Sequence, residues 1–67
     1  MDFQIFARFI RPLDTVEFEH KETDDWKEAI DMFFMFSKNP ECVNCECDYF
    51  DENGQQRTTL LYEAPRM

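Results

Sequence analysis

Residues 43–64 read VNCECDYFDENGQQRTTLLYEA, and this pattern predicts a β-hairpin. Asn53-Gly54 is a typical two-residue hairpin turn, and the runs on either side of it have strand-like composition. Counting outward from the turn pairs Tyr49 with Thr58, and it continues the same register toward both ends of the hairpin. One face is then apolar or small throughout: Val43, Cys45, Cys47, Tyr49, Thr58, Leu60, Tyr62 and Ala64. A one-residue slip would place charges on that face, so the alternation fixes the register.

The N-terminal segment predicts a second hairpin. Residues 3–11 alternate as a strand does, and we expect the odd positions to face the core: Phe3, Ile5, Ala7 and Phe9. Pro12-Leu13-Asp14 interrupts this strand. Residues 15–21 then alternate again. We expect apolar Val16 and Phe18, with His20, to point inward, and Thr15, Glu17, Glu19 and Lys21 to point outward.

Between the two hairpins the apolar period changes to that of a helix. Thr23 or Asp24 is a suitable N-cap, and early carboxylates favour the positive end of the helix dipole. The apolar stripe has three-and-four spacing and comprises Trp26, Ala29, Ile30, Phe33, Phe34 and Ser37. Asn39-Pro40 predicts the end of the helix. Met32, Met35 and Phe36 lie partly off the stripe, so the second half of the helix is apolar nearly all round.

The predicted order of elements is therefore strand, strand, helix, strand, strand. We expect an α+β fold of ββαββ type, with one four-stranded, mostly antiparallel sheet and the single helix packed on one face. The 67 residues suffice for a single small acidic domain, residues 1–67. The sequence does not predict the order of strands in the sheet.

Composition restricts the class of partner. The chain has 15 Asp and Glu against 7 Lys and Arg, a formal net charge of −8. This charge repels nucleic acid and anionic membranes and favours basic protein surfaces, so we expect no direct nucleic-acid binding and no membrane partner. The acidic residues expected on outward positions are the candidates for a partner-binding surface: Glu17, Glu19, Asp24, Asp25, Glu28, Asp31, Glu46 and Asp48.

The cysteines allow an alternative function. Cys42, Cys45 and Cys47 are close in sequence, and thiolates are preferred zinc ligands. With His20 as fourth ligand, they would make a small zinc-binding module. We favour buried, small apolar cysteines instead, because residues three apart on a regular strand, such as Cys42 and Cys45, point to opposite faces. No cofactor is expected.

The sequence shows no enzymatic motif. It has one histidine and one glycine, and the glycine falls in a predicted turn. We find no nucleophile elbow, phosphate-binding loop, dinucleotide fingerprint or calcium loop. We therefore expect a protein that is not an enzyme and has no catalytic residues.

The apolar residues exceed what one helix on one sheet face can cover. Phe6, Ile10, Phe50 and Leu61 fall on the sheet face opposite the predicted core. With the three helix residues off the stripe, they predict self-association, in the simplest case a homodimer. The candidate residues are Phe6, Ile10, Met32, Met35, Phe36, Phe50 and Leu61.

The longest apolar run, residues 32–36, is too short to span a bilayer, and the first residues do not resemble a signal peptide. Three cysteines, an odd number, indicate reduced thiols. We therefore expect a cytoplasmic protein. The resulting hypothesis is a small, non-catalytic acidic interaction protein. It would act as a DNA-mimic-type inhibitor or regulator on a nucleic-acid-handling partner, in a phage or mobile-element context.

Overall fold

The computed structural model describes residues 2–65. Its elements are β1 (Phe3–Arg11), a 3₁₀ turn (Pro12–Asp14), β2 (Thr15–Thr23), α1 (Trp26–Ser37), β3 (Cys42–Phe50) and β4 (Gln56–Glu63). The strands form one sheet in the order β2-β1-β3-β4, and all neighbouring strands are antiparallel. This confirms the predicted α+β fold with one helix on one sheet.

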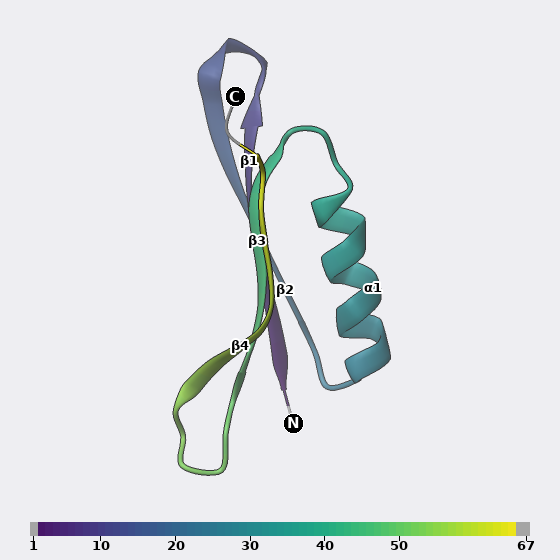
Figure 1. Cartoon of the computed structure of the whole chain (residues 1–67), viewed down its shortest axis with the longest axis vertical. Helices are drawn as coiled ribbons and strands as arrows, with labels where there is room; N and C mark the ends of the chain where they lie inside the picture. The colour runs from purple at the N-terminus through teal and green to yellow at the C-terminus, as the bar shows by residue number, and fades with distance from the viewer. Residues whose placement is uncertain (1, 66–67) are drawn as a thin grey trace.

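The helix lies against one face of the sheet and leaves the other face open (Figure 1). The turns of the two hairpins extend past α1 at opposite ends, which gives an elongated molecule of 41 × 20 × 18 Å. We call the sheet face away from α1 the open face.

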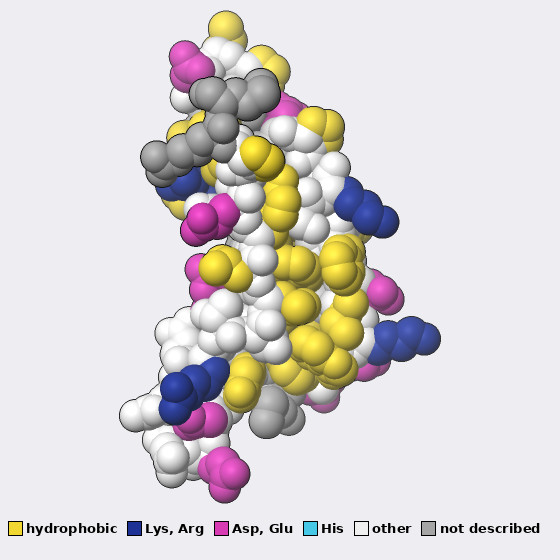
Figure 2. Space-filling model, viewed as in Figure 1, with side chains coloured by type: hydrophobic (Ala, Val, Ile, Leu, Met, Phe, Trp, Pro, Cys, Tyr) yellow, Lys and Arg dark blue, Asp and Glu magenta, His cyan; other side chains and the backbone are white. Residues whose placement is uncertain are grey.

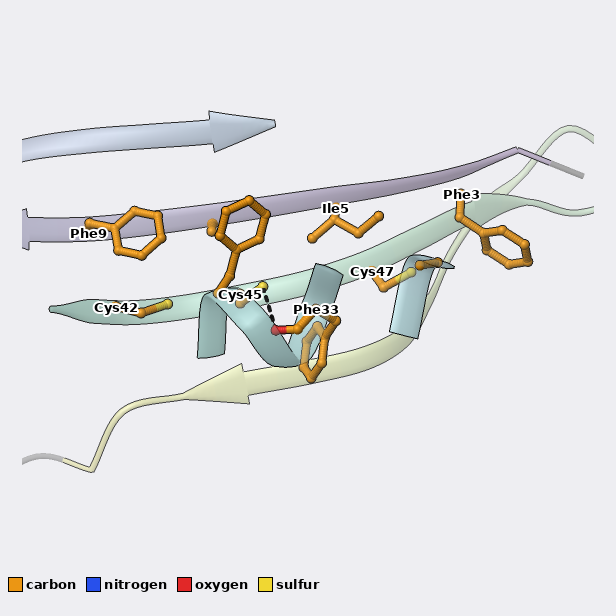
Figure 3. Packing of buried hydrophobic residues seen from close by; sticks show 10 residues of the cluster. Phe3, Ile5, Phe9, Phe33, Cys42, Cys45 and Cys47 are labelled. Carbon is orange, nitrogen blue, oxygen red and sulfur yellow. Dashed lines mark hydrogen bonds between the residues drawn. The ribbon is translucent and has the colours of Figure 1, made fainter. Parts of the chain in front are cut away.

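The core lies between α1 and the two central strands. As predicted, Phe3, Ile5, Ala7 and Phe9 of β1 are buried there, and the three cysteines of β3 lie beside them (Figure 3). The helix contributes Ala29, Phe33 and Phe36. Phe36 contacts Phe9 edge-on, with 5.8 Å between ring centroids. The placement of Phe36 outside the stripe was wrong, and so was that of Phe34 within it, because Phe34 is 48% exposed.

The ends of the helix follow local hydrogen bonding. The N-cap is Asp25 rather than the predicted Thr23 or Asp24, and its carboxylate accepts a hydrogen bond from the Lys27 N–H at 3.0 Å. Thr23 Oγ1 in turn accepts from the Asp25 N–H at 3.1 Å. The helix ends at Ser37, just before Asn39-Pro40, as predicted.

The C-terminal hairpin has the predicted register only away from its turn. Cys45 opposes Tyr62 and Cys47 opposes Leu60, as predicted, but a bulge follows in β4. Beyond the bulge Thr58 opposes Asp48, not Tyr49, and so lies on the open face. Residues 51–55 form the loop in place of the predicted two-residue turn. The Asp51 carboxylate organises this loop by accepting hydrogen bonds from the backbone N–H groups of residues 53 and 55.

The orientation predicted for β2 was wrong. His20 opposes Phe6 and Glu19 opposes Ala7, so Val16, Phe18 and His20 lie on the open face while Glu17, Glu19 and Lys21 lie on the helix side. β2 is an edge strand, and its helix side stays polar because α1 packs mainly against the central strands β1 and β3. Phe18 is consequently 75% exposed.

A second irregularity places all three cysteines in the core. The pairing of β1 with β3 shifts after Arg8, so that Phe9 opposes Cys42. The predicted divergence of Cys42 from Cys45 was therefore wrong: the bulge turns both side chains toward α1, and both are buried. The predicted role of Cys45 and Cys47 as small buried residues is confirmed.

Candidate partner-binding surfaces

Six of the eight acidic candidates gather on one side of the molecule. We call this surface the acidic flank, and it comprises Glu17, Glu19, Asp24, Asp25, Glu28 and Asp31. Glu17 and Glu19 are on the helix side of β2, the edge strand. Asp24 and Asp25 follow directly after β2, at the start of α1. The β2–α1 connection thus joins the two parts of this surface.

The helix has two flanks of opposite character. Trp26, Ile30 and Phe34 repeat every four residues and form an apolar flank, whereas Glu28 and Asp31 lie on the other side of the helix. Figure 2 shows hydrophobic side chains gathered on the flank of α1 that lies beside β4. Glu28 therefore faces the β2 side, where Glu17 and Glu19 lie, and Asp31 lies next to it on the helix surface that points away from the sheet.

Some carboxylates of the acidic flank have structural roles. Glu17 Oε2 accepts a hydrogen bond from Arg11 Nε at 3.1 Å, and Arg11 Nη1 also donates to Glu41 at 2.9 Å. Asp25 caps the helix. Asp24, Glu28 and Asp31 are exposed, and within residues 2–65 they have no ion pair. These three are the carboxylates most available to a partner.

Glu46 and Asp48 do not belong to this surface. Both lie on the open face, and Asp48 is only 3% exposed. Its carboxylate accepts hydrogen bonds from Gln56 Nε2 at 2.7 Å and Thr58 Oγ1 at 2.8 Å. Hydrogen bonding to Asp48, together with burial and the repulsion between the two carboxylates, raises the pKa of Glu46. We therefore assign the Asp48 carboxylate to the stability of the hairpin, and we place neither Glu46 nor Asp48 in the partner-binding surface.

The open face combines aromatic and apolar side chains. Phe6 stacks on His20 with ring centroids 4.6 Å apart, and Ile10, Val16 and Phe18 are exposed beside them. Two shallow hollows of about 370 and 330 Å³ share Arg8 and Asn44 in their linings.

The predicted self-association residues fall in three places. Phe6, Ile10, Phe50 and Leu61 lie on the open face, as the alternation predicted. Met35 is exposed on α1, Met32 is half-buried against the core, and Phe36 is inside it. Phe36 therefore has no surface to offer a second copy.

The four ligands of the zinc alternative are not brought together. Cys42, Cys45 and Cys47 point toward α1, whereas His20 lies on the open face. Within residues 2–65 no group of three or more His, Cys, Asp or Glu side chains is arranged to hold a metal ion. Burial is the main cause that raises the pKa of the Cys45 thiol, to about 12, which opposes formation of the thiolate that zinc requires.

The apolar flank is a surface that the sequence analysis missed. It comprises Trp26, Ile30 and Phe34 of α1, with Tyr49, Leu60 and Tyr62 of the neighbouring strands. Trp26 is 41% exposed, although its ring lies 5.1 Å from that of Phe3. Tyr49, Leu60 and Tyr62 pack against the core but remain half-buried. Its signal in the sequence is the four-residue repeat of Trp26, Ile30 and Phe34, which the stripe predicted above places wholly in the core.

The chain matches no known protein family, no curated protein and no solved structure. Among the described residues, no helix has the length and apolar character needed to cross a membrane.

Proposed function

We propose that this chain is a small, non-catalytic interaction protein that binds a basic surface of a partner protein through its acidic flank. The observation that supports this most directly is the gathering of six carboxylates along β2 and the start of α1. Lys21 is the one basic residue among those that β2 directs to the same side. A partner rich in Lys and Arg gains long-range attraction and faster association from such a surface.

The partner class that we propose is a nucleic-acid-handling protein, for which the chain would act as a DNA-mimic-type inhibitor or regulator in the cytoplasm. Alternate residues on a strand repeat at about 6.6 Å, so Glu17 and Glu19 carry negative charge at a regular spacing on a rigid support. The helix adds further exposed carboxylates beside them. A surface of this kind occupies a basic groove without presenting bases to it.

Charge reversal tests the proposal. Partners captured from the native host with the wild-type chain are purified, and their affinity is measured for Glu28→Lys/Asp31→Lys. These two side chains are exposed and have no ion pair within the described residues, so the fold should be retained. We expect at least about tenfold weaker binding, which corresponds to about 1.4 kcal/mol, and an affinity that falls steeply with salt.

The matched control is Glu52→Lys/Glu63→Lys, which changes the net charge equally but lies outside the acidic flank. It should weaken binding much less. Double-stranded DNA should compete with the chain for the same partner. Equal loss in both double variants, binding that is insensitive to salt, or simultaneous binding of DNA and the chain would contradict the proposal.

Self-association is the second part of the proposal. It is supported by the apolar residues left exposed on the open face and along the apolar flank, including Phe18 at 75% and Leu61 at 63%. Many exposed apolar side chains on one small protein are typical of an interaction site. Sedimentation equilibrium of the wild-type chain tests this part, and a strict monomer at all concentrations would contradict it.

A further inference from the structure

The two edges of the sheet differ in charge. β2 carries four charged side chains along one edge: Glu17, Glu19, Lys21 and Glu22. β4, the other edge, has Arg57 and Glu63 near its ends, and the residues between them, 58–62, are all uncharged. Charged side chains protect an edge strand from pairing with a further strand, and an uncharged edge lacks this protection. β4 is therefore the edge that can accept another strand.

The backbone of β4 is oriented for such pairing at Leu61. The Ala64 N–H donates a hydrogen bond to the Val43 carbonyl at 2.9 Å, so the backbone groups of Ala64 face β3. In an antiparallel ladder, alternate residues direct these groups to the same side. The N–H and C=O of Leu61 therefore point away from β3, toward the free edge.

The side chains around Leu61 make both sides of this edge apolar. Leu61 lies on the open face and is 63% exposed. Leu60 and Tyr62 lie on the helix side, half-buried, and Figure 2 shows hydrophobic side chains continuing from there to α1. A strand added to β4 would thus cover apolar surface on both faces of the sheet.

We propose that the occupant of this edge is a second copy of the chain, paired antiparallel through β4 to form a continuous eight-stranded sheet. A two-fold axis at Leu61 places this residue opposite its own equivalent, and both of its backbone groups then pair. The same register sets Leu60 opposite Tyr62 of the second copy, and Thr59 opposite Glu63. No two like charges face each other, whereas like charges directly opposite would destabilise the pair.

The absence of charge on the β4 edge favours a second copy of the chain at this edge over the basic partner proposed above. The apolar flank and residues 58–62 contain no carboxylate, so a basic strand would find no counter-charge there. Two chains of net charge −8 repel each other, and this edge lets them meet with their acidic flanks at the far ends of the joined sheet. The two apolar flanks then face each other across the two β4 strands. This inference rests on the proposed self-association, but it does not depend on the binding of a basic partner.

Hydrogen exchange in the wild-type chain tests the edge without any mutation. Amide exchange rates are measured by NMR at concentrations on both sides of the dimerisation midpoint found by sedimentation equilibrium. We expect exchange of the Leu61 N–H to slow at least about tenfold when the dimer forms, because that group becomes hydrogen-bonded. The N–H of Phe18 on β2, the opposite edge strand, serves as the control and should not change with concentration.

Two substitutions test the same contact. Leu61→Pro removes the outward N–H without touching the ladder to β3, and proline is tolerated at such edge positions. Leu61→Lys keeps the N–H but sets two cations opposite each other. Both variants should be monomeric, with the circular dichroism spectrum of the wild type. Phe18→Lys, which places a charge at another exposed apolar position, on β2, should remain a dimer.

The outcomes separate the two proposals. A wild-type chain that stays monomeric overturns self-association itself. A wild-type dimer whose Leu61 N–H remains unprotected overturns the β4 edge, as does a dimer that persists in folded Leu61→Lys. Loss of the dimer in Phe18→Lys alone would assign the interface to the open face instead. Should either Leu61 variant not fold, the exchange measurement on the wild type still decides.

Discussion

Glu46 and Asp48 place two carboxyl groups on neighbouring positions of the open face of β3. Hydrogen bonding to Asp48 and partial burial raise the pKa of Glu46 in the folded chain. Below its unfolded pKa of about 4.3, Glu46 is protonated in both states and its interaction with Asp48 is favourable. As the pH rises through the raised folded pKa, the proton is lost and the folded state is destabilised.

Glu46→Gln should therefore raise the free energy of unfolding at pH 7 by up to about 1 kcal/mol, the size of a close charge interaction on a sheet. Near pH 4 the effect should be small, because wild-type Glu46 is then largely protonated. Urea unfolding at both pH values measures the difference. Glu52→Gln removes the same charge from the exposed hairpin loop and serves as control. An equal effect at both pH values would refute the assignment.

Leu13 is strained by its backbone. Its φ of 71° lies in the left-handed region, which costs a non-glycine residue about 1–2 kcal/mol. The side chain is 95% exposed, so a substitution there loses no packing. We expect Leu13→Asn to raise the free energy of unfolding by about 0.5–1 kcal/mol, because asparagine tolerates this conformation better.

The control for Leu13 is Phe18→Asn, which replaces another exposed apolar residue, but on a regular strand. It should lower the stability slightly, since asparagine is unfavourable in strands. Thermal unfolding of the two variants distinguishes relief of strain from a general effect of removing exposed apolar surface. Similar changes in both would contradict the strain argument.

At the scale of the element, the start of α1 has two neighbouring carboxylates with different roles: Asp25 caps the helix, and Asp24 is free to contact a partner. Asp25 accepts the Lys27 N–H hydrogen bond at 3.0 Å, whereas Asp24 is exposed and belongs to no ion pair within residues 2–65. Asp25→Ala should cost about 1 kcal/mol of stability through loss of the cap. Asp24→Ala should cost little, yet it removes the same charge. Chemical denaturation compares the two, and equal costs would mean that charge alone accounts for the effect.

The elements themselves were predictable because their periods are clear. Alternation in residues 3–11 and 43–64, and three-and-four spacing from Trp26, suffice to give ββαββ and the single helix. The errors arise where tertiary context decides. No local pattern marks the bulges near Phe9 and in β4, yet they turn Cys42 inward and Thr58 outward.

The sequence leaves two orientations open for different reasons: which side of β2 faces α1, and which side of α1 faces the core. In β2 the alternation is clear, but it does not predict which set of side chains faces α1, because the core of this edge strand's neighbours is formed without it. In α1 the apolar run extends round the helix, so packing alone chooses Phe36 over Phe34 for the core. The sequence identifies the exposed carboxylates but not which of them share a surface. Glu46 and Asp48 lie on the open face, away from the acidic flank, and only the tertiary structure shows this.

At the scale of the whole molecule, the ββαββ order distributes the surfaces across the sheet. The acidic flank lies at the β2 edge and the uncharged edge is β4, with the core strands between them. Pairing of two copies through β4 would put the two acidic flanks at opposite ends of eight strands. Seven strand spacings correspond to about 34 Å. A dimer would thus present two separate acidic surfaces to one extended basic partner.

Two linked sites bind an extended ligand more tightly than one site does, because the second contact is intramolecular. We expect the wild-type dimer to bind poly-lysine of about 40 residues some 10²-fold more tightly than a lysine octapeptide, which reaches only one flank. Leu61→Pro should lose most of this advantage while its affinity for the octapeptide stays unchanged, because the acidic flank is intact. Glu28→Lys/Asp31→Lys should weaken both ligands. Isothermal titration at fixed salt measures all six affinities, and a monomeric Leu61→Pro that kept the full advantage would show that the two flanks do not act together.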